Sequence, residues 1–444
     1  MGTPIALQQA TSAEPGEHAH PGRAASSDAD RQTSWSASRG FRFGLLFALT
    51  MTEMMPVALL SRAMPVLLRR SGASMEAISL LSLVMLPWAV KALWAPLVDK
   101  LGAGSRLGRY RGWLFITHPL LLLTLVLGAF IDVPALLSTQ RAVGIPALVW
   151  LSIISATADT ASHGLAVNLL KVSERGIGNG VQTAGMMTGG LVGGGMMVVM
   201  VGKFGWQPAL LIMAALVLLP LFGVAFYKEP PVALERTISL GDFLAFFSQP
   251  RIWRWLAVMS ATLALPSLPG VAFQTLLVDR GLNLTEIGLV LGILGGAVGT
   301  VGGLLGGLVV SRLGRERAFY ALNALSVVCL TLAAVLITRP AANHFMLFAS
   351  ILLIHFGLAA GGTIIYVMIM DRSRGHVAST DYTIQYSLMQ LCGFLGMGAG
   401  GFIAGRAGST ILFIMVPLLM LAGLLVTPRL LSRADFQPGP DPQP

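Results

Sequence analysis

The stretch PLVDKLG, residues 96–102, recurs as LVVSRLG at residues 308–314, 212 positions further along the chain. Upstream of each copy, GASMEAISLL (72–81) parallels GLNLTEIGLV (281–290) at an offset of 209. Apolar segments can resemble one another by chance because they share a composition, but the polar ends of these copies argue against chance. The pattern indicates a chain built of two similar halves that run in the same direction.

The composition indicates a membrane protein. Of the 444 residues, 55% are hydrophobic and only 11% are charged, and the mean hydropathy is +0.74. A soluble domain carries about 25% charged residues. The net charge of +10 does not indicate a nucleic-acid partner, because the basic residues lie in short clusters between apolar runs, as they do in membrane proteins.

The apolar runs are long enough to cross a bilayer, which takes roughly 20 residues each. We expect twelve transmembrane helices, and they fall at 41–67, 76–99, 112–131, 143–170, 177–201, 207–227, 252–278, 285–311, 318–338, 343–370, 378–404 and 408–431. The predicted domains are a disordered cytoplasmic tail (1–40), a six-helix half (41–227), a central cytoplasmic loop (228–251), a second six-helix half (252–431) and a disordered tail (432–444).

The basic residues also predict the orientation. One set of alternate loops, beginning with the loop at 100–111, holds fifteen Lys and Arg residues, whereas the other set holds seven. Because the richer set faces the cytoplasm, and because twelve is an even number, we expect both termini to be cytoplasmic.

Ionisable residues inside apolar spans are the first candidates for a functional site. Each costs about 2.5–3.5 kcal/mol at the centre of a membrane helix, so it is expected to face a cavity or a partner. By helical rise, Glu53 and Asp159 lie about 18 Å from the inner ends of their spans, and Lys91 and His163 about 12 Å. This polar layer could bind a polar substrate or carry a proton. The alternative is a structural ion pair, for example Glu53 with Lys91.

The second half offers a less charged and more aromatic set of candidates. His355 and Gln390 fall near mid-depth, and Tyr366, Gln385 and Tyr386 lie closer to the inner side. A charged half that faces an aromatic half suits an amphipathic, ring-bearing ligand. Arg62, near the outer end of the first span, is expected to extend towards the membrane surface.

The loops after the second and eighth spans supply candidate gate residues. They read DKLGAGSRLGRYR (99–111) and SRLGRER (311–317), and both resemble the cytoplasmic gating motif of major facilitators. We expect Asp99 to pair with Arg109 or Arg111, and we expect a weaker gate from Arg312, Arg315 and Arg317, because Ser311 replaces the acid. The arginines could equally serve only to set the topology.

Glycines recur every fourth residue in three spans, at 185, 189 and 193, at 299, 303 and 307, and at 396 and 400. Such stripes let helices approach closely and rock against their neighbours. No hydrolase, nucleotide-binding or metal motif is present, and Cys329 and Cys392 form no CxxC pattern. We therefore expect no enzyme activity, no cofactor and no metal, and an ion gradient as the energy source.

Longer stretches resemble one branch of the major facilitators. LPWAVKALWAPLVDKLG (86–102), ATADTASHGLAVNLL (156–170) and ERGIGNGVQTAGMMTGGLVGGG (174–195) are similar to the AmpG-like branch, and ASTDYTIQYSLMQ (378–390) is most similar to its RhtX/FptX group. That resemblance implies the major facilitator fold and a siderophore importer of the bacterial inner membrane. The branch's fourth-span acid falls on Asp159. A second acid, four residues later in many relatives, is His163 here, which bears on any proton scheme that needs both.

The resulting expectation is a monomeric, proton-coupled importer of a siderophore-like small molecule, with the lipid bilayer as its surroundings. Other members of the branch import muropeptides or carry acetyl-CoA, so a muropeptide permease or a drug exporter of the same fold is an alternative. A membrane assembly factor that moves no solute is a third reading. That reading requires no charges at mid-membrane, and four such residues at similar depths argue against it.

Overall fold

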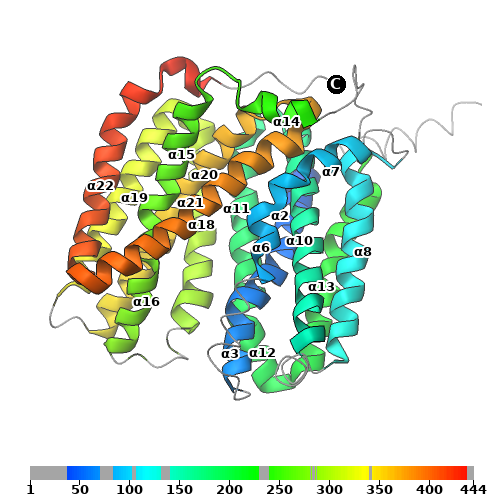
Figure 1. The fold of residues 1–444 in the computed structure, drawn as a ribbon, viewed down its shortest axis with the longest axis horizontal. Helices are drawn as coiled ribbons and strands as arrows, with labels where there is room; N and C mark the ends of the chain where they lie inside the picture. The colour runs from blue at the N-terminus through cyan, green and yellow to red at the C-terminus, as the bar shows by residue number, and fades with distance from the viewer. Residues whose placement is uncertain are drawn as a thin grey trace, which may run out of the picture.

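The computed structural model describes residues 38–70, 84–102, 107–131, 141–229, 240–280, 282, 286, 288–339 and 343–437. Within these ranges every regular element is a helix, and most helices run roughly along one axis (Figure 1). The expected tail at 1–40 lies almost wholly outside the described residues. Ser38 begins the described chain, and its hydroxyl accepts a hydrogen bond from the Phe41 backbone N–H at 3.3 Å, which caps the first helix.

The first half contains six spans. Their helices are α2 (Arg39–Ala58), η1 (Leu59–Ala63) and α3 (Met64–Arg70); α6 (Leu86–Val90), η2 (Lys91–Leu93) and α7 (Ala95–Gly102); α8 (Arg109–Ala129); α10 (Arg141–Leu169); η3 (Val172–Glu174), α11 (Arg175–Leu191), η4 (Val192–Met196) and α12 (Met197–Phe204); and α13 (Trp206–Phe226).

The second half follows a short connecting helix, α14 (Leu240–Phe246). Its helices are α15 (Ile252–Ser267) and α16 (Gly270–Asp279); η5 (Leu289–Leu294) and α18 (Gly295–Leu313); α19 (Arg315–Ile337); α20 (His344–Asp371); η6 (Gly375–Val377) and α21 (Ala378–Ala407); α22 (Ser409–Leu430); and η7 (Arg433–Phe436).

Ten helices of the described residues are each long and apolar enough to cross a membrane. They correspond to ten of the twelve expected spans. The second and seventh expected spans are also helical, but each is interrupted. The second contains the 3₁₀ turn η2 at Lys91, and the seventh divides between Ser267 and Gly270, next to Pro266. Proline interrupts a helix because it lacks an N–H donor and its ring clashes with the preceding turn.

Three hydrophobic cores show how the halves meet. One core is shared and combines residues of both halves, among them Val98, Leu165, Ile369 and Tyr382. A second core contains residues 55–217 only, and a third contains residues 268–420 only. The shared core lies towards the upper end in Figure 1, where α14 is found. We call this the gate end. The halves therefore pack together at the gate end and have separate cores towards the other.

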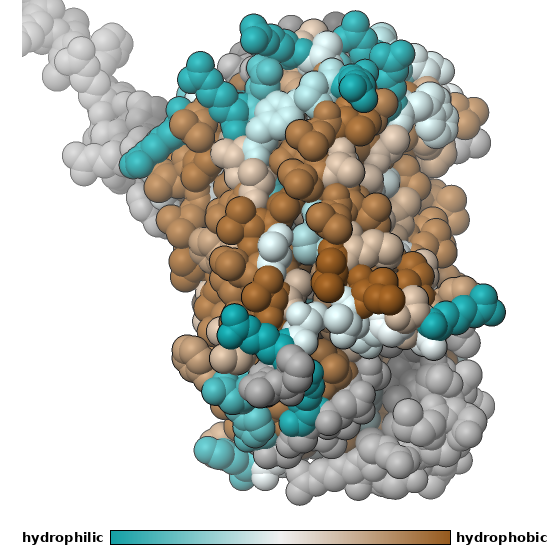
Figure 2. All heavy atoms as spheres, turned by 90° about the vertical axis from the view of Figure 1, so that its left-hand side faces the viewer, coloured by the Kyte–Doolittle hydropathy of each residue, from teal (hydrophilic) through white to brown (hydrophobic). Residues whose placement is uncertain are grey.

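An apolar belt surrounds the bundle. Figure 2 shows a hydrophobic surface across the middle of the face formed by the second half, with hydrophilic residues both above and below it. On α22, Leu418 is 60% exposed and Leu425 is 69% exposed. Large apolar side chains in such positions are stable in contact with lipid, and the helical backbone leaves no polar group unpaired there. The chain is a multi-pass membrane protein.

The tail expected to be disordered from residue 432 is ordered as far as residue 437. Ser432 and Asp435 form a capping box around η7, Asp435 contacts Arg372 at 3.2 Å, and the Phe436 ring packs 5.5 Å from Phe319. Asp435 also receives hydrogen bonds that lower its pKa, although burial alone would raise it. The prediction of disorder was wrong for residues 432–437. It relied on the Pro-rich composition, which does not reveal that Phe436 packs against α19.

Candidate functional site

The interruption of the second span presents Lys91 to the interior. Lys91 is fully buried, and its ammonium group pairs with the carboxylate of Asp159 on α10. The same nitrogen lies 4.3 Å from the centre of the Trp88 ring and 4.4 Å from that of the Tyr386 ring. Both are cation–π distances. Tyr386 belongs to the second half, so this one lysine connects an acid of the first half with an aromatic ring of the second.

Glu53 lies beside this ion pair on α2 and is fully buried. Its backbone carbonyl accepts a hydrogen bond from Ser155 at 2.9 Å. Neither carboxylate oxygen has a partner of hydrogen-bonding geometry among the described residues. The alternative pair of Glu53 with Lys91 is therefore not formed, because Lys91 is bound to Asp159 instead.

His163 lies one helical turn beyond Asp159. Its Nδ1 atom is 3.9 Å from the Asp159 carboxylate. The imidazole meets the Tyr382 ring edge to face at 4.1 Å and the Tyr386 ring at 5.3 Å. These geometries are favourable for aromatic pairs, so His163 joins the charged side of the site to its aromatic side.

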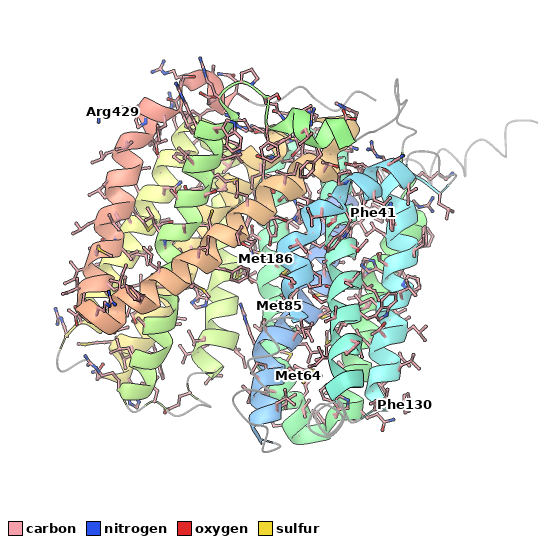
Figure 3. All side chains as sticks on the ribbon, viewed as in Figure 1. Phe41, Met64, Met85, Phe130, Met186 and Arg429 are labelled. Carbon is pink, nitrogen blue, oxygen red and sulfur yellow. The ribbon has the colours of Figure 1, made fainter. Side chains whose placement is uncertain are left out.

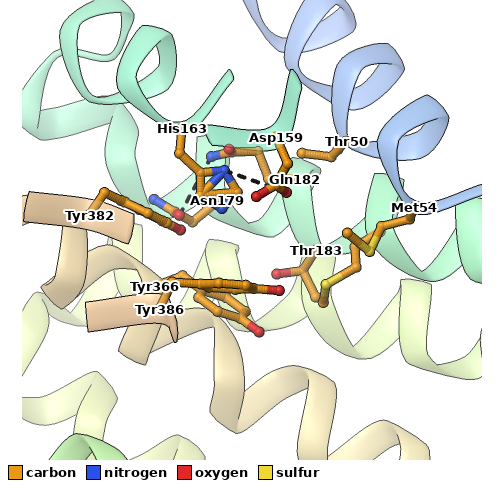
Figure 4. A pocket seen from close by; sticks show the side chains of 11 residues that line it. Thr50, Met54, Asp159, His163, Asn179, Gln182, Thr183, Tyr366, Tyr382 and Tyr386 are labelled. Atoms are coloured by element: carbon orange, nitrogen blue, oxygen red, sulfur yellow. Dashed lines mark hydrogen bonds and ion pairs between the residues drawn. The ribbon is translucent and has the colours of Figure 1, made fainter. Parts of the chain in front are cut away.

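Asp159, His163, Tyr382 and Tyr386 line a pocket between the halves (Figure 4). The enclosed cavity has a volume of about 30 Å³, close to that of one water molecule, so the two halves must move apart before this pocket can hold a small-molecule ligand. Its lining consists of Thr50, Met54, Asp159, His163, Asn179, Gln182, Thr183, Met186, Tyr366, Tyr382 and Tyr386. Figure 4 shows Asp159 and His163 on one side and Tyr366 and Tyr386 on the other.

Five predicted site residues do not line this pocket. Two of them, Glu53 and Lys91, are fully buried and are not among its lining residues. Gln385 is buried in a structural role: its amide donates to Ile369 O and Asp381 O, and it accepts a hydrogen bond from Trp255 Nε1 at 2.6 Å. Gln390 is half-buried further along α21. His355 lies three turns from Tyr366 on α20, where Nδ1 is 2.9 Å from Ile351 O.

Sequence reasoning missed the amide and threonine wall on α11. Asn179, Gln182 and Thr183 lie in the quoted run NGVQT, and Gln182 Nε2 donates to Asn179 Oδ1 at 3.5 Å. Tyr382 was missed as well, although it stands beside Asp381 in the quoted TDYTIQ stretch. The available signal was the recurrence of polar residues at helical spacing within an apolar span. This signal is weak for uncharged side chains, because they cost less to bury than charged ones.

The gate end contains the predicted acidic residue in a cross-half network. Arg109 contacts the Asp99 carboxylate at 3.0 Å, and Tyr110 donates to it at 2.6 Å. Thr380 of α21 donates to the same carboxylate, and Arg109 donates to His376 O at 2.5 Å. Asp99 therefore joins α7 and α8 of the first half to α21 of the second, and Arg109 extends the network to η6.

Arg111 does not take part in that network. It donates to Val224 O and Ala225 O, each at 2.8 Å, within its own half. Next to it, Glu229 accepts the backbone N–H groups of Tyr110 and Arg111 at 2.9 Å each. Burial raises the pKa of Glu229, and the two N–H donors counteract this rise. Glu229 thus caps α8, as an anion at a helix N-terminus does.

Of the three gate arginines predicted in the second half, only Arg315 contacts described residues of the first half. Arg315 meets Asp371 at 3.0 Å and also donates to Val172 O of the first half at 2.8 Å. Asp371 also pairs with Arg175 of the first half at 2.6 Å. Arg312 and Arg317 are exposed. The sequence did not single out Asp371, because the resemblance placed the expected acid at Ser311.

The glycine stripes bring helices into close contact, but with different partners. A Cβ on Gly307 of α18 would lie 2.6 Å from Gly176 O of the first half. A Cβ on Gly396 of α21 would lie 2.5 Å from Ala264 O of α15 in its own half. Gly185, Gly189 and Gly193 pack against α2, also within their own half. Only the α18 stripe therefore faces the opposite half.

No group of three metal-ligating side chains occurs among the described residues. The arrangement offers instead one buried ion pair, a further buried carboxylate without a hydrogen-bond donor, and a tyrosine wall, all at the contact between two halves. Such a site can bind a polar ligand and exchange a proton; it has no nucleophile paired with a base.

Comparison with known proteins shows which family this chain resembles. The sequence profile described as Major Facilitator Superfamily matches residues 45–322 and 267–443. An anhydromuropeptide permease of Escherichia coli is 26% identical over 286 residues, which cover 62% of this chain and 57% of the permease. An uncharacterised protein of Haemophilus influenzae is 30% identical over 41% of this chain and 42% of its own length. The chain thus matches about half the length of these two relatives.

Solved structures show the same fold. A bacterial homologue of the iron transporter ferroportin, in an outward-facing state, superposes with a TM-score of 0.65 at 16% identity and covers 88% of this chain and all of its own. The Escherichia coli fucose:proton symporter gives a TM-score of 0.64 at 14% identity, covering 88% of this chain and 98% of its own. With a profile match across both halves, the chain belongs to the major facilitator superfamily, whose members are transporters.

Proposed function

We propose that this chain is a proton-coupled importer that moves a siderophore-like ligand by alternating access. The observation that carries the proposal is the central pocket. Its first-half wall is charged, with Asp159 beside Lys91, and its second-half wall is aromatic, with Tyr366, Tyr382 and Tyr386. A ligand that carries both polar chelating groups and apolar or ring surface can use both walls at once.

The proposed orientation places the gate end in the cytoplasm. The loops at that end carry the larger share of Lys and Arg residues, as the positive-inside rule requires. The shared hydrophobic core and the Asp99 network close that end. The arrangement then corresponds to a protein that is closed to the cytoplasm, with the pocket approached from outside and both termini inside.

Proton coupling fits the Glu53, Lys91 and Asp159 cluster. A buried carboxylate without a hydrogen-bond donor is costly when ionised, so Glu53 suits the group that takes up a proton. Asp159 is already paired with the Lys91 ammonium group. We infer that inward opening, which moves Tyr386 of the second half away from Lys91, changes the balance between these three groups and releases the proton to the cytoplasmic side.

An anhydromuropeptide is the second candidate ligand. The Escherichia coli relative is an anhydromuropeptide permease, and its similarity covers 62% of this chain. Tyrosine rings stack on sugar rings as they do on other flat apolar surfaces, and the amides of Asn179 and Gln182 suit a peptide. The siderophore proposal is favoured by the resemblance of ASTDYTIQYSLMQ (378–390), because Tyr382 and Tyr386 of that stretch line the pocket.

The test is an uptake measurement with both ligand classes. Cells with and without the gene receive iron-55 on a panel of purified siderophores and, separately, labelled anhydromuropeptide, each with and without a protonophore. Uptake of one iron complex that needs the gene and collapses with the protonophore is the expected result. Gene-dependent uptake of the muropeptide alone would replace the siderophore by the second candidate.

Variants on α10 connect uptake to the site. Asp159→Asn is expected to abolish uptake because it removes the charge that holds Lys91. Thr157→Val is the matched control, since the Thr157 hydroxyl bonds only to Ile153 O of the same helix. Equal uptake by both variants, at equal protein levels in the membrane, would contradict the assignment of Asp159 to coupling.

A further inference from the structure

The Arg62 side chain does not extend towards the membrane surface but lies against the fifth span. A Cβ added to Gly190 would lie 3.3 Å from its Nη1 atom, and one added to Gly194 would lie 3.3 Å from its Cδ atom. The side chain therefore lies across α11 and η4 of the fifth span, against two glycines that leave room for it. The expectation that Arg62 extends towards the membrane surface is wrong for this structure.

The position of Arg62 continues the pocket-lining face of the first span. Thr50 and Met54 line the pocket, and Ala58 and Arg62 follow at the same four-residue spacing, which keeps residues on one helix face. The Ala58 side chain also approaches Gly194, at 3.7 Å from a Cβ placed there. By helical rise, Arg62 lies about 12 Å beyond Met54, away from the gate end.

The fifth span shows the same continuation. Its pocket residues include Thr183 and Met186, and Gly190 and Gly194 follow Met186 at intervals of four. Figure 3 shows Met186 near the middle of the bundle and Met64, two residues past Arg62, towards the end opposite the gate. Arg62 thus lies where two pocket-lining faces continue towards the far end of the protein.

His355 reaches this place from the second half. It precedes Tyr366 by eleven residues on α20, which is three turns plus about 20°, so the two share a helix face. Gly295 of η5–α18 makes room for it, because a Cβ there would lie 2.9 Å from the imidazole. Its Nδ1 atom is held by Ile351 O, and Arg62 is within electrostatic range. The ring nitrogen Nε2 has no hydrogen-bond partner among the described residues.

The Arg62 side chain is not covered by other parts of the protein, and none of the carboxylates in the described ranges forms an ion pair with it. A cation within a membrane helix is costly unless it faces water or binds a partner. Guanidinium groups bind carboxylates and similar anions through two parallel hydrogen bonds. The position therefore suits an arriving anion better than an internal partner.

We propose that Arg62 and His355 form an anion-recognition site on the outer approach to the central pocket, where they receive a carboxylate-class group of the ligand before it reaches Asp159 and the tyrosines. The site rests on the proposed transport pathway, but it does not depend on which ligand that pathway carries. It adds a ligand requirement: the transported molecule has at least one exposed anionic group.

A labelling experiment tests the site without any substrate. Met54→Cys places a thiol in the pocket, in a background where Cys329→Ala and Cys392→Ala remove the native thiols. The rate of modification from outside is measured at low salt with an anionic and a cationic methanethiosulfonate reagent of similar size. With Arg62 present, we expect the anionic reagent to be favoured. Arg62→Gln should lower the anion-to-cation ratio by about threefold or more, from one charge at about 12 Å in water.

Controls make each outcome decisive. Lys203→Gln removes one positive charge at the same end of the fifth span but away from the pathway face, and it should leave the ratio unchanged; Arg62→Lys should keep it. A ratio that does not respond to Arg62→Gln, or a Met54→Cys thiol that neither reagent reaches, would overturn the proposal. If the labelling result holds while no siderophore is taken up, the anion site stands and the ligand assignment fails.

In transport, the same site predicts a change in KM. Once a ligand is identified, Arg62→Gln should raise KM at least several-fold with little change in maximal rate, and Arg62→Lys should recover part of the affinity. An analogue in which the anionic group is esterified should bind equally to the parent and to Arg62→Gln. Loss of the maximal rate with an unchanged KM would instead assign Arg62 to the conformational change and contradict recognition.

Discussion

Asp99 of α7 accepts two hydrogen bonds from Thr380 of α21, one from the backbone N–H at 2.8 Å and one from the hydroxyl at 2.6 Å, although 281 residues separate them in the chain. The same carboxylate holds Arg109 and Tyr110 of its own half. Asp99 is thus one of the residues that fasten the two halves together at the gate end, along with the Arg175–Asp371 pair, and opening this end requires its bonds to Thr380 to break.

Asp99→Asn should loosen the gate end. Hydrogen bonds to a charged group contribute about 1.5–3 kcal/mol each, so a thiol just inside the gate should become at least about tenfold more reactive from the cytoplasmic side. Thr383→Cys, one turn below Thr380 and buried, supplies that thiol in inside-out vesicles. Arg317→Gln, an exposed change at the same end, is the control. An unchanged labelling rate would mean that Asp99 does not hold the halves together.

Lys91→Met should destabilise the protein by about 3–5 kcal/mol, because it leaves the Asp159 carboxylate buried and uncompensated. The double variant Lys91→Met with Asp159→Leu should recover most of the thermal stability, since a buried pair can be replaced by apolar side chains. It should not recover transport. Thermal unfolding in detergent and uptake in cells measure the two effects separately. Recovery of both would show that the pair is only structural.

Gly396→Ala and Gly398→Ala form a matched pair on α21. A Cβ at Gly396 would lie 2.5 Å from Ala264 O, whereas one at Gly398 would have no atom within 4 Å. We expect Gly396→Ala to destabilise by about 1–3 kcal/mol through overpacking. Gly398→Ala should be neutral or stabilising, by up to about 1 kcal/mol, from helix propensity. Similar unfolding temperatures for the two variants would contradict the close packing of α21 on α15.

Phe436→Ala should release the C-terminal turn η7 from the gate end. Its ring packs near Phe319 and Tyr320 of α19, and burying a Phe side chain contributes about 1.5–3 kcal/mol. The expected result is faster proteolysis after residue 431 in inside-out vesicles. Gln437→Ala, at an exposed neighbour, should leave the cleavage rate unchanged. If the parent chain is cut as quickly as the variant, η7 does not dock in the membrane-embedded protein.

The sequence predicted which ionisable residues form the candidate polar layer, but it did not predict how they pair. Glu53, Lys91, Asp159 and His163 were found because a charge in an apolar span is costly and therefore conspicuous. Which acid binds Lys91 could not be found in this way, because both lie at similar depths. The choice depends on the 3₁₀ turn at Lys91, which directs the ammonium towards α10 rather than α2.

The gate shows the same limit. The motif predicted that Asp99 pairs with Arg109 or Arg111, and the structure has the pair with Arg109. Asp371, Arg175 and Thr380 were not predicted, because they meet across a contact between segments about 200 residues or more apart. Gln385 is the opposite case. Its polarity within an apolar span suggested a ligand contact, but Trp255 Nε1 and two backbone carbonyls use its amide completely.

The sequence by itself determined the membrane class, the twelve segments, the repeat and the depth of each ionisable residue. Those properties depend on hydropathy and helical rise, which are local. Only the tertiary structure decided that the halves share a core at one end and not at the other, that Lys91 pairs with Asp159, and that Arg62 lies along the pocket face. Those facts depend on which helix faces which. When a helix has apolar residues on every face, its own sequence does not indicate which face contacts its neighbours.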